Sequence, residues 1–126
     1  MQSKTIIVVE DDPLTAQLVA GVLRGLGHRV ETCDDSERAV ALAVRLVPAA
    51  MLVDLRLGAE SGEALIARLA DDRRTAGIPV IAMTAANEPE VLATLDRAGV
   101  VALLEKPFSA TDVAALVEAV LMAGPK

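Results

Sequence analysis

The chain repeats one pattern five times: a short apolar run, then a longer stretch in which apolar residues recur at helical spacing. Four of the runs are apolar almost throughout and rich in β-branched residues, as buried parallel strands are: residues 5–9, 51–53, 80–83 and 100–104. The fifth run, residues 29–33, alternates apolar and polar positions, which is typical of a strand at the edge of a sheet. The pattern therefore predicts five strands, one of them weaker than the rest.

The stretches between these runs place apolar residues three or four positions apart, so that they share one face of a helix. The residues concerned are Leu14, Leu18, Val22 and Leu26; Val40, Ala43 and Val44; Leu65, Ile66 and Leu69; Val91, Leu92 and Leu95; and Val113, Leu116, Val117, Val120 and Leu121. Pro13 fits the first turn of a helix, while Gly27 and Gly99 fit helix ends. Strands that alternate with helices predict an α/β fold, in which a parallel sheet is covered by helices on both faces.

Composition narrows the classes of protein. The length of 126 residues indicates a single domain over residues 1–126, with a core from about residue 5 to residue 123 and no linker inside it. Hydrophobic residues make up 53% of the chain but aromatic residues only 1%, so we expect an aliphatic core. The net charge of −6 argues against direct contact with nucleic acid, whose phosphates require a clustered basic surface.

Two features of the sequence favour a cytoplasmic protein. Cys33 is the only cysteine, so an intramolecular disulfide is excluded, as is usual in a reducing compartment, and we expect this residue to be buried. The apolar run near the N-terminus stops at Glu10 after only a few residues, so it is too short for a signal peptide or a membrane span. We therefore expect neither export nor membrane insertion.

Polar residues stand where four of the predicted strands stop: Glu10 and Asp11, Asp54, Thr84 and Lys106. Each one alone is consistent with a solvated turn, a helix cap or a surface charge. Ligands of open parallel sheets bind at the carboxyl ends of the strands, however, so we expect these side chains to meet in one crevice. Three crowded carboxylates require a cation, and Mg²⁺ fits because the Cys and His ligands of zinc are missing. A hydroxyl and an ammonium group beside that metal suit a phosphate.

The order and spacing of the Glu10–Asp11 pair, Asp54, Thr84 and Lys106–Pro107 resemble the signature of the receiver domain of two-component response regulators, the CheY-like superfamily. The resemblance extends from residue 5 to about residue 123. It implies a flavodoxin-like, doubly wound (βα)5 fold whose five-stranded parallel sheet has the order 2-1-3-4-5. It also implies a phosphoacceptor of a phosphorelay, which assists its own phosphorylation and dephosphorylation and is not an enzyme for external substrates.

The resemblance assigns the acceptor and the metal ligands. Asp54 accepts a phosphoryl group from a histidine of a sensor histidine kinase or of a histidine phosphotransfer protein, and the altered surface then acts on a downstream target protein. Mg²⁺ is held directly by Asp11, through water by Glu10, and also by Asp54. The backbone carbonyl of Arg56 completes the protein's share of the coordination.

The resemblance also assigns the residues around the phosphoryl group. The Thr84 hydroxyl and the Lys106 ammonium hold its oxygens, and the small side chain of Ala85 leaves room for it to enter. The peptide bond between Lys106 and Pro107 is cis in receivers of this kind, which directs the lysine inward. These four residues are therefore expected to surround the acceptor.

The chain departs from the family's pattern at the switch position, three residues before the lysine, where Leu103 replaces the usual Tyr or Phe. In the family the threonine, here Thr84, moves toward the phosphate as that ring turns inward; a leucine has no hydroxyl and less area to bury. Two further positions set the lifetime of the phosphoryl group. Arg56 is placed to shield it from water, whereas Ala86 is too small to orient or block a water molecule.

Simpler predictions concern the loop after Asp54 and His28. Gly58 stands where receivers commonly carry proline, and together with Gly62 it predicts a loosened loop after Asp54. His28 follows a glycine and precedes the predicted edge strand, so we expect it in a solvated loop rather than in a catalytic role.

Three alternatives stay open beside a stand-alone receiver that acts through protein contacts. The first is a phosphorylation-independent interaction module with the same fold, which only Leu103 favours. The second is a receiver fragment of a larger hybrid kinase or regulator, which depends on whether Lys126 is the natural end. The third is a small metal-dependent phosphohydrolase, but such enzymes that resemble this chain carry a second Asp where Arg56 stands.

Overall fold

The computed structural model describes residues 3–58, 60–85, 93 and 99–125, and its centre is one parallel sheet. The strands follow the order β2-β1-β3-β6-β7, and their bounds are β1 Thr5–Val9, β2 Arg29–Cys33, β3 Ala50–Asp54, β6 Val80–Thr84 and β7 Val100–Glu105. Numbered along the main sheet alone, this order is 2-1-3-4-5, which confirms the flavodoxin-like prediction. The alternating run is the edge strand β2, as its weaker pattern indicated.

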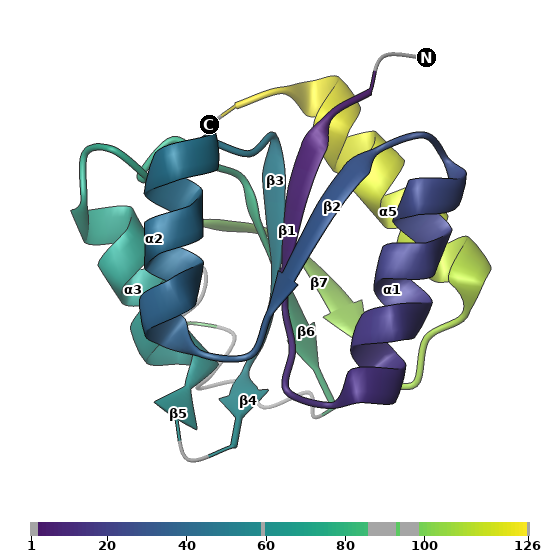
Figure 1. The fold of residues 1–126 in the computed structure, drawn as a ribbon, viewed down its shortest axis with the longest axis horizontal. Helices are drawn as coiled ribbons and strands as arrows, with labels where there is room; N and C mark the ends of the chain where they lie inside the picture. The colour runs from purple at the N-terminus through teal and green to yellow at the C-terminus, as the bar shows by residue number, and fades with distance from the viewer. Residues whose placement is uncertain (1–2, 59, 86–92, 94–98, 126) are drawn as a thin grey trace.

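Helices cover both faces of this sheet. Among the described residues they are α1 Pro13–Gly25, α2 Ser36–Leu46, α3 Gly62–Asp71 and α5 Ala110–Ala123. Figure 1 shows α2 and α3 on one face and α1 and α5 on the other. The fourth predicted helical segment, around Val91, Leu92 and Leu95, lies outside the described residues.

Two apolar clusters form the core, one on each face of the sheet. Successive residues of a strand point to opposite faces, so Ile7 and Val9 join the cluster beneath α2 and α3, and Ile6 and Val8 join the one beneath α1 and α5. The central strands are buried on both sides for this reason, and their sequences are apolar without alternation. Val, Leu, Ile, Ala and Met fill both clusters, as the composition predicted.

Capping residues fix the helix starts at the carboxyl edge of the sheet. Asp12 accepts a hydrogen bond from the Thr15 N–H at 3.3 Å, and Pro13 occupies the first helical position of α1. Ser61 caps α3 and Ser109 caps α5 in the same way. The connections after β1 and β7 therefore take only a few residues, 10–12 and 106–109.

A small hairpin follows β3 that the sequence did not predict. Its strands are β4 Arg56–Leu57 and β5 Glu60–Ser61, which pair in antiparallel fashion at the carboxyl end of the main sheet (Figure 1). Gly58 has a φ of 60°, which suits glycine at this turn. Gly62 lies so close to β3 that a Cβ there would be 2.0 Å from the Asp54 carbonyl oxygen. The segment after Asp54 is thus a short hairpin that ends against β3, and the looseness expected from its glycines stays a prediction.

The expectation for His28 is wrong, because the structure buries it. Its side chain is only 1% exposed, the Lys4 N–H donates to its Nδ1 at 3.2 Å, and its Nε2 lies 2.9 Å from Glu118 Oε1 on α5. An imidazole whose Nδ1 accepts a hydrogen bond carries its proton on Nε2, which then donates to the carboxylate. His28 thus links Lys4, which precedes β1, to α5. It lies near the amino end of β1, whereas the acidic residues follow the carboxyl ends of the strands.

The expected burial of Cys33 is confirmed. Cys33 is buried at the end of β2, and burial raises the pKa of its thiol to about 11. No helix in the described part of the chain is long and apolar enough to cross a membrane.

Candidate functional site

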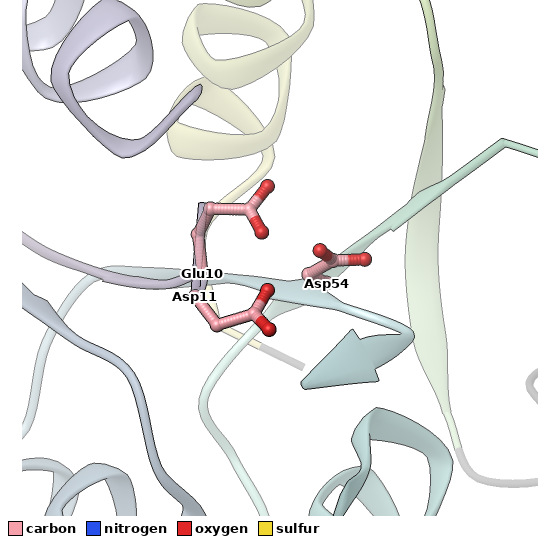
Figure 2. A group of neighbouring side chains, drawn as sticks. All are labelled: Glu10, Asp11 and Asp54. Atoms are coloured by element: carbon pink, nitrogen blue, oxygen red, sulfur yellow. The ribbon is translucent and has the colours of Figure 1, made fainter. Parts of the chain in front are cut away.

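Three carboxylates converge at the carboxyl edge of the sheet. Glu10 and Asp11 follow β1, and Asp54 ends β3; each offers an oxygen within 4.8 Å of the others. Figure 2 shows the three carboxylate groups turned toward a shared space. Glu10 and Asp54 are buried, at 3% and 5% exposure, whereas Asp11 is exposed to solvent. A ligand at this group would therefore enter from the Asp11 side.

Strand register brings these residues together. β1 and β3 are neighbours, and Val9 pairs with Val53, so the next residue on each strand, Glu10 and Asp54, lies at the same level. The Glu10 N–H donates to the Cys33 carbonyl of β2 at 3.0 Å, which extends the sheet by one bond at that point. The site therefore depends on the parallel pairing that the apolar runs produce.

Lys106 bridges two of the carboxylates. Its Nζ donates to Glu10 Oε1 at 3.0 Å and to Asp54 Oδ2 at 3.0 Å. The Lys106 N–H donates to the Thr84 carbonyl at 2.7 Å, so the lysine directly extends the β6–β7 pairing. Its peptide bond to Pro107 is cis, as predicted.

The remaining predicted residues that the structure describes lie on or next to three other strands, β4, β6 and β7. Thr84 ends β6, the strand next to β3, and is buried at 8% exposure, with the exposed Ala85 after it. The Arg56 side chain is exposed on β4, while its N–H donates to Asp54 Oδ1 at 3.0 Å. Leu103 on β7 is 41% exposed. Ala86 lies outside the described residues.

Burial and hydrogen bonds separate the pKa values of the site. Burial, reinforced by the hydrogen bond with Asp54, raises the pKa of Glu10 from 4.5 to about 7. Burial acts to raise the pKa of Asp54 too, but hydrogen bonds with Glu10, the Arg56 N–H and Lys106 outweigh it and hold that pKa below its ordinary value. For Lys106, burial lowers the pKa, and its hydrogen bonds to the two carboxylates more than reverse this. At neutral pH, Asp54 is ionised and Lys106 is charged.

The donor set fits a hard divalent cation. The group consists of carboxylates alone, without His or Cys, and oxygen ligands of this type suit Mg²⁺. Among the described residues, Lys106 pairs with two of the three carboxylates, Glu10 and Asp54, so the fully ionised group keeps a negative charge that a cation would offset. Glu10, Asp11 and Asp54 are thus the residues able to hold the predicted metal.

Sequence reasoning missed one residue that shapes the site. Gly62 begins α3 and packs against the main chain at Asp54, and its N–H donates to the Leu55 carbonyl at 3.1 Å. The signal in the sequence is a glycine directly after Ser61, the residue that caps α3, at a position where other residues favour a helix start better. Gly62 allows two stretches of main chain to approach closely. Composition alone does not distinguish such a glycine from one in a flexible loop.

A parallel sheet with an acidic pair, an aspartate, a threonine and a lysine at its carboxyl edge defines the receiver class of signalling domain. The chain belongs to this family: residues 6–118 match the model of the response regulator receiver domain. The predicted family resemblance is thereby confirmed.

Individual relatives agree with this assignment. The chain is 34% identical over 116 residues to the DNA-binding dual master transcriptional regulator RpaA of Synechocystis sp., covering 92% of this chain and 48% of RpaA. It is 31% identical to the phosphate regulon transcriptional regulatory protein PhoB of Pseudomonas aeruginosa, covering 96% of this chain and 53% of PhoB. The chain thus spans about half the length of these curated relatives.

A solved structure matches the fold over nearly the full length of both chains. The crystal structure of a putative response regulator from Chloroflexus aurantiacus superposes with a TM-score of 0.87 at 26% identity, covering 96% of this chain and 99% of that one. The whole described sheet and its helices therefore correspond to a receiver of similar size.

Proposed function

We propose that Asp54 is the phosphoacceptor of this receiver and that it takes a phosphoryl group from a partner histidine in the presence of Mg²⁺. The observation that carries the proposal is the position of the Lys106 ammonium, which contacts Asp54 and Glu10 within the carboxylate group. An aspartate without a specific role normally lies at the surface, whereas Asp54 is only 5% exposed and lies between a lysine and two further acids.

The environment of Asp54 suits a nucleophile. Its lowered pKa keeps it ionised at neutral pH, and its two oxygens are oriented separately, Oδ1 by the Arg56 N–H and Oδ2 by Lys106. One carboxylate oxygen forms the new O–P bond as the P–N bond to the donor imidazole breaks, and the leaving imidazole takes up a proton. The fixed carboxylate lowers the entropy cost of that in-line approach.

Asp11, Glu10, Asp54 and the Arg56 backbone carbonyl are the groups we assign to Mg²⁺. The bound metal would supply positive charge that offsets the charge on the transferring phosphoryl oxygens. Asp11 is the exposed member and would meet the cation from solvent, and the charge of the cation would favour the ionised form of Glu10.

The residues around the acceptor complete the assignment. Thr84 and Lys106 hold phosphoryl oxygens, and the exposed Ala85 leaves the approach open. The exposed side chain of Arg56 on β4 is the group we assign to shielding the phosphoryl group from water. Thr84 and Leu103 form the switch, in which a half-exposed leucine repacks instead of an aromatic ring.

The receiver works through protein contacts and not through turnover of an external substrate. We assign as its partners a sensor histidine kinase or a histidine phosphotransfer protein and a downstream target protein, all met in the cytoplasm. We also propose that residues 1–126 form a single domain. This domain makes no direct contact with nucleic acid, in keeping with its net charge of −6. Leu103 favours one alternative, a module with the same fold that binds its target without phosphorylation.

Intact mass after incubation with acetyl phosphate tests the acceptor. We expect the wild type to gain one phosphoryl group only when Mg²⁺ is present, and Asp54→Asn to gain none. Asp71→Asn makes the same chemical change at an exposed position on α3 and should behave as the wild type. An adduct on Asp54→Asn would refute the assignment. No adduct on folded wild type, with acetyl phosphate or with a phosphorylated histidine phosphotransfer protein, would favour the phosphorylation-independent module.

A further inference from the structure

The β4–β5 hairpin forms one wall of the acidic group. The Arg56 N–H contacts Asp54 Oδ1 at 3.0 Å, and the backbone at Gly58 lies so near Asp11 that a Cβ there would be 3.4 Å from Oδ2. The hairpin is therefore bonded to one of the three carboxylates and lies beside a second, so a shift of the hairpin would change the spacing of their oxygens.

Very little holds the hairpin in place by itself. It consists of two residue pairs, Arg56 with Ser61 and Leu57 with Glu60, and two-stranded ribbons are marginal in water even when longer. Leu57 is buried at 3% exposure and anchors one strand in the core. The other strand, β5, is exposed at both residues and needs an anchor of a different kind.

Glu60 supplies that anchor. Its Oε2 accepts a hydrogen bond from the Ser36 N–H at 3.3 Å, and Ser36 is the first residue of α2, 24 positions earlier in the chain. The first N–H groups of a helix have no partner within the helix and carry partial positive charge, so a carboxylate is favoured there. In Figure 1 the hairpin lies at the end of the molecule where α2 begins.

We infer that Glu60 is a positioning residue for the acidic group: by tying the β4–β5 hairpin to the N-terminus of α2, it sets the affinity of that group for Mg²⁺. The inference rests on the proposed function, since it concerns the metal assigned to Glu10, Asp11 and Asp54. It adds a route of regulation, because a partner that displaces the exposed Glu60 from α2 weakens metal binding without touching a ligand.

The test is a Mg²⁺ titration followed by backbone amide chemical shifts. We expect Glu60→Ala to weaken Mg²⁺ binding roughly three- to tenfold, at or below the lower end of the effect of losing an outer partner of a metal ligand. Glu60→Gln keeps an oxygen that accepts the Ser36 N–H and should retain most of the affinity. Glu63→Ala removes the same charge from the first turn of α3 and serves as the matched control.

A second variant removes the donor and leaves the charge of Glu60 intact. Ser36→Pro deletes the N–H at the first helical position, where proline is tolerated, and Asp35 already has the extended backbone that must precede proline. It should weaken Mg²⁺ binding as much as Glu60→Ala, and the double variant should add nothing further. Without metal, both single variants should shift the Arg56 and Gly58 amides.

The outcomes separate this inference from the proposed function. Wild type that shows no Mg²⁺-dependent shift refutes the metal assignment itself, and the inference with it. Wild type that binds while Glu60→Ala binds equally well overturns only the role of Glu60. Equal weakening by Glu60→Ala and Glu63→Ala would also overturn it, because the effect would then be general loss of negative charge. Additive effects of Glu60→Ala and Ser36→Pro would show that the two residues act separately.

Discussion

We expect Gly62→Ala, which adds a single methyl group, to destabilise the protein strongly. The added Cβ would lie 2.0 Å from the Asp54 carbonyl oxygen, 2.7 Å from Leu55 Cα and 2.9 Å from the Asp54 carbonyl carbon. Carbon and carbonyl oxygen normally approach to about 3.3–3.6 Å at closest, so the chains must separate by more than an ångström. All three atoms are main chain, so no rotamer change relieves the overlap.

The cost follows from what must move. Overpacking a core by one methyl group costs about 1–3 kcal/mol, and this site belongs at or above the top of that range because the Leu55 N–H is bonded to the Met83 carbonyl at 3.0 Å. We therefore expect Gly62→Ala to lower the free energy of unfolding by about 3 kcal/mol or more. A shift of Asp54 by about 1 Å should also slow phosphorylation by about 100-fold.

Gly21→Ala is the matched control for this prediction. Gly21 lies inside α1, is exposed, and has nothing within 4 Å of an added Cβ, so the same methyl group should stabilise the protein by about 0.5–1 kcal/mol. Urea unfolding followed by far-UV circular dichroism measures both variants, since the chain has no Trp or Tyr for fluorescence. Equal midpoints for Gly62→Ala and wild type, or similar losses for both variants, would refute the reasoning.

Other expectations concern burial, water access and proton linkage. His28→Ala removes a buried ring and its contact with Glu118, so urea unfolding should show a loss of about 2–4 kcal/mol, whereas phosphorylation of the folded protein should stay unchanged. Arg56→Ala should shorten the phosphoryl half-life several-fold in a mass-based decay assay; an unchanged half-life would remove its shielding role. In the folded protein the pKa of Glu10 is raised from 4.5 to about 7. Without metal, Glu10 therefore adds to the free energy of unfolding below pH 4.5, and this contribution is lost as the pH rises through about 7. The rise in melting temperature on adding Mg²⁺ should therefore grow over that interval, and a rise independent of pH would contradict the assignment.

The parts of the structure predicted from sequence are those with a periodic signal. Apolar runs identify strands because both faces of a parallel strand are buried, and the polar residues that end them, such as Asp54 and Lys106, then meet at one edge. The distance along the chain is irrelevant to this reasoning: Lys106 reaches Glu10 across 96 positions, and sheet order alone brings them together.

The missed features lack such a signal. A hairpin of two residue pairs is too short for alternation to appear, and Gly58 and Gly62 resemble loop residues in any window of the sequence. His28 is polar and follows a glycine, so local rules place it in solvent; its burial depends on Glu118, 90 positions away on α5. Tertiary partners decide both cases, and a single sequence does not reveal them.

The geometry of Lys106 explains how the site can be ready for a phosphoryl group before one arrives. A lysine ammonium has three N–H donors, and two of them are used, one on Glu10 and one on Asp54. Within the described residues, the third donor is left for an oxygen of an incoming group. In the proposed transfer, Lys106 would orient Asp54 and neutralise charge on the phosphoryl group at the same time, without releasing Asp54. An arginine would not replace it, because a planar guanidinium cannot direct its donors to three oxygens arranged around one point.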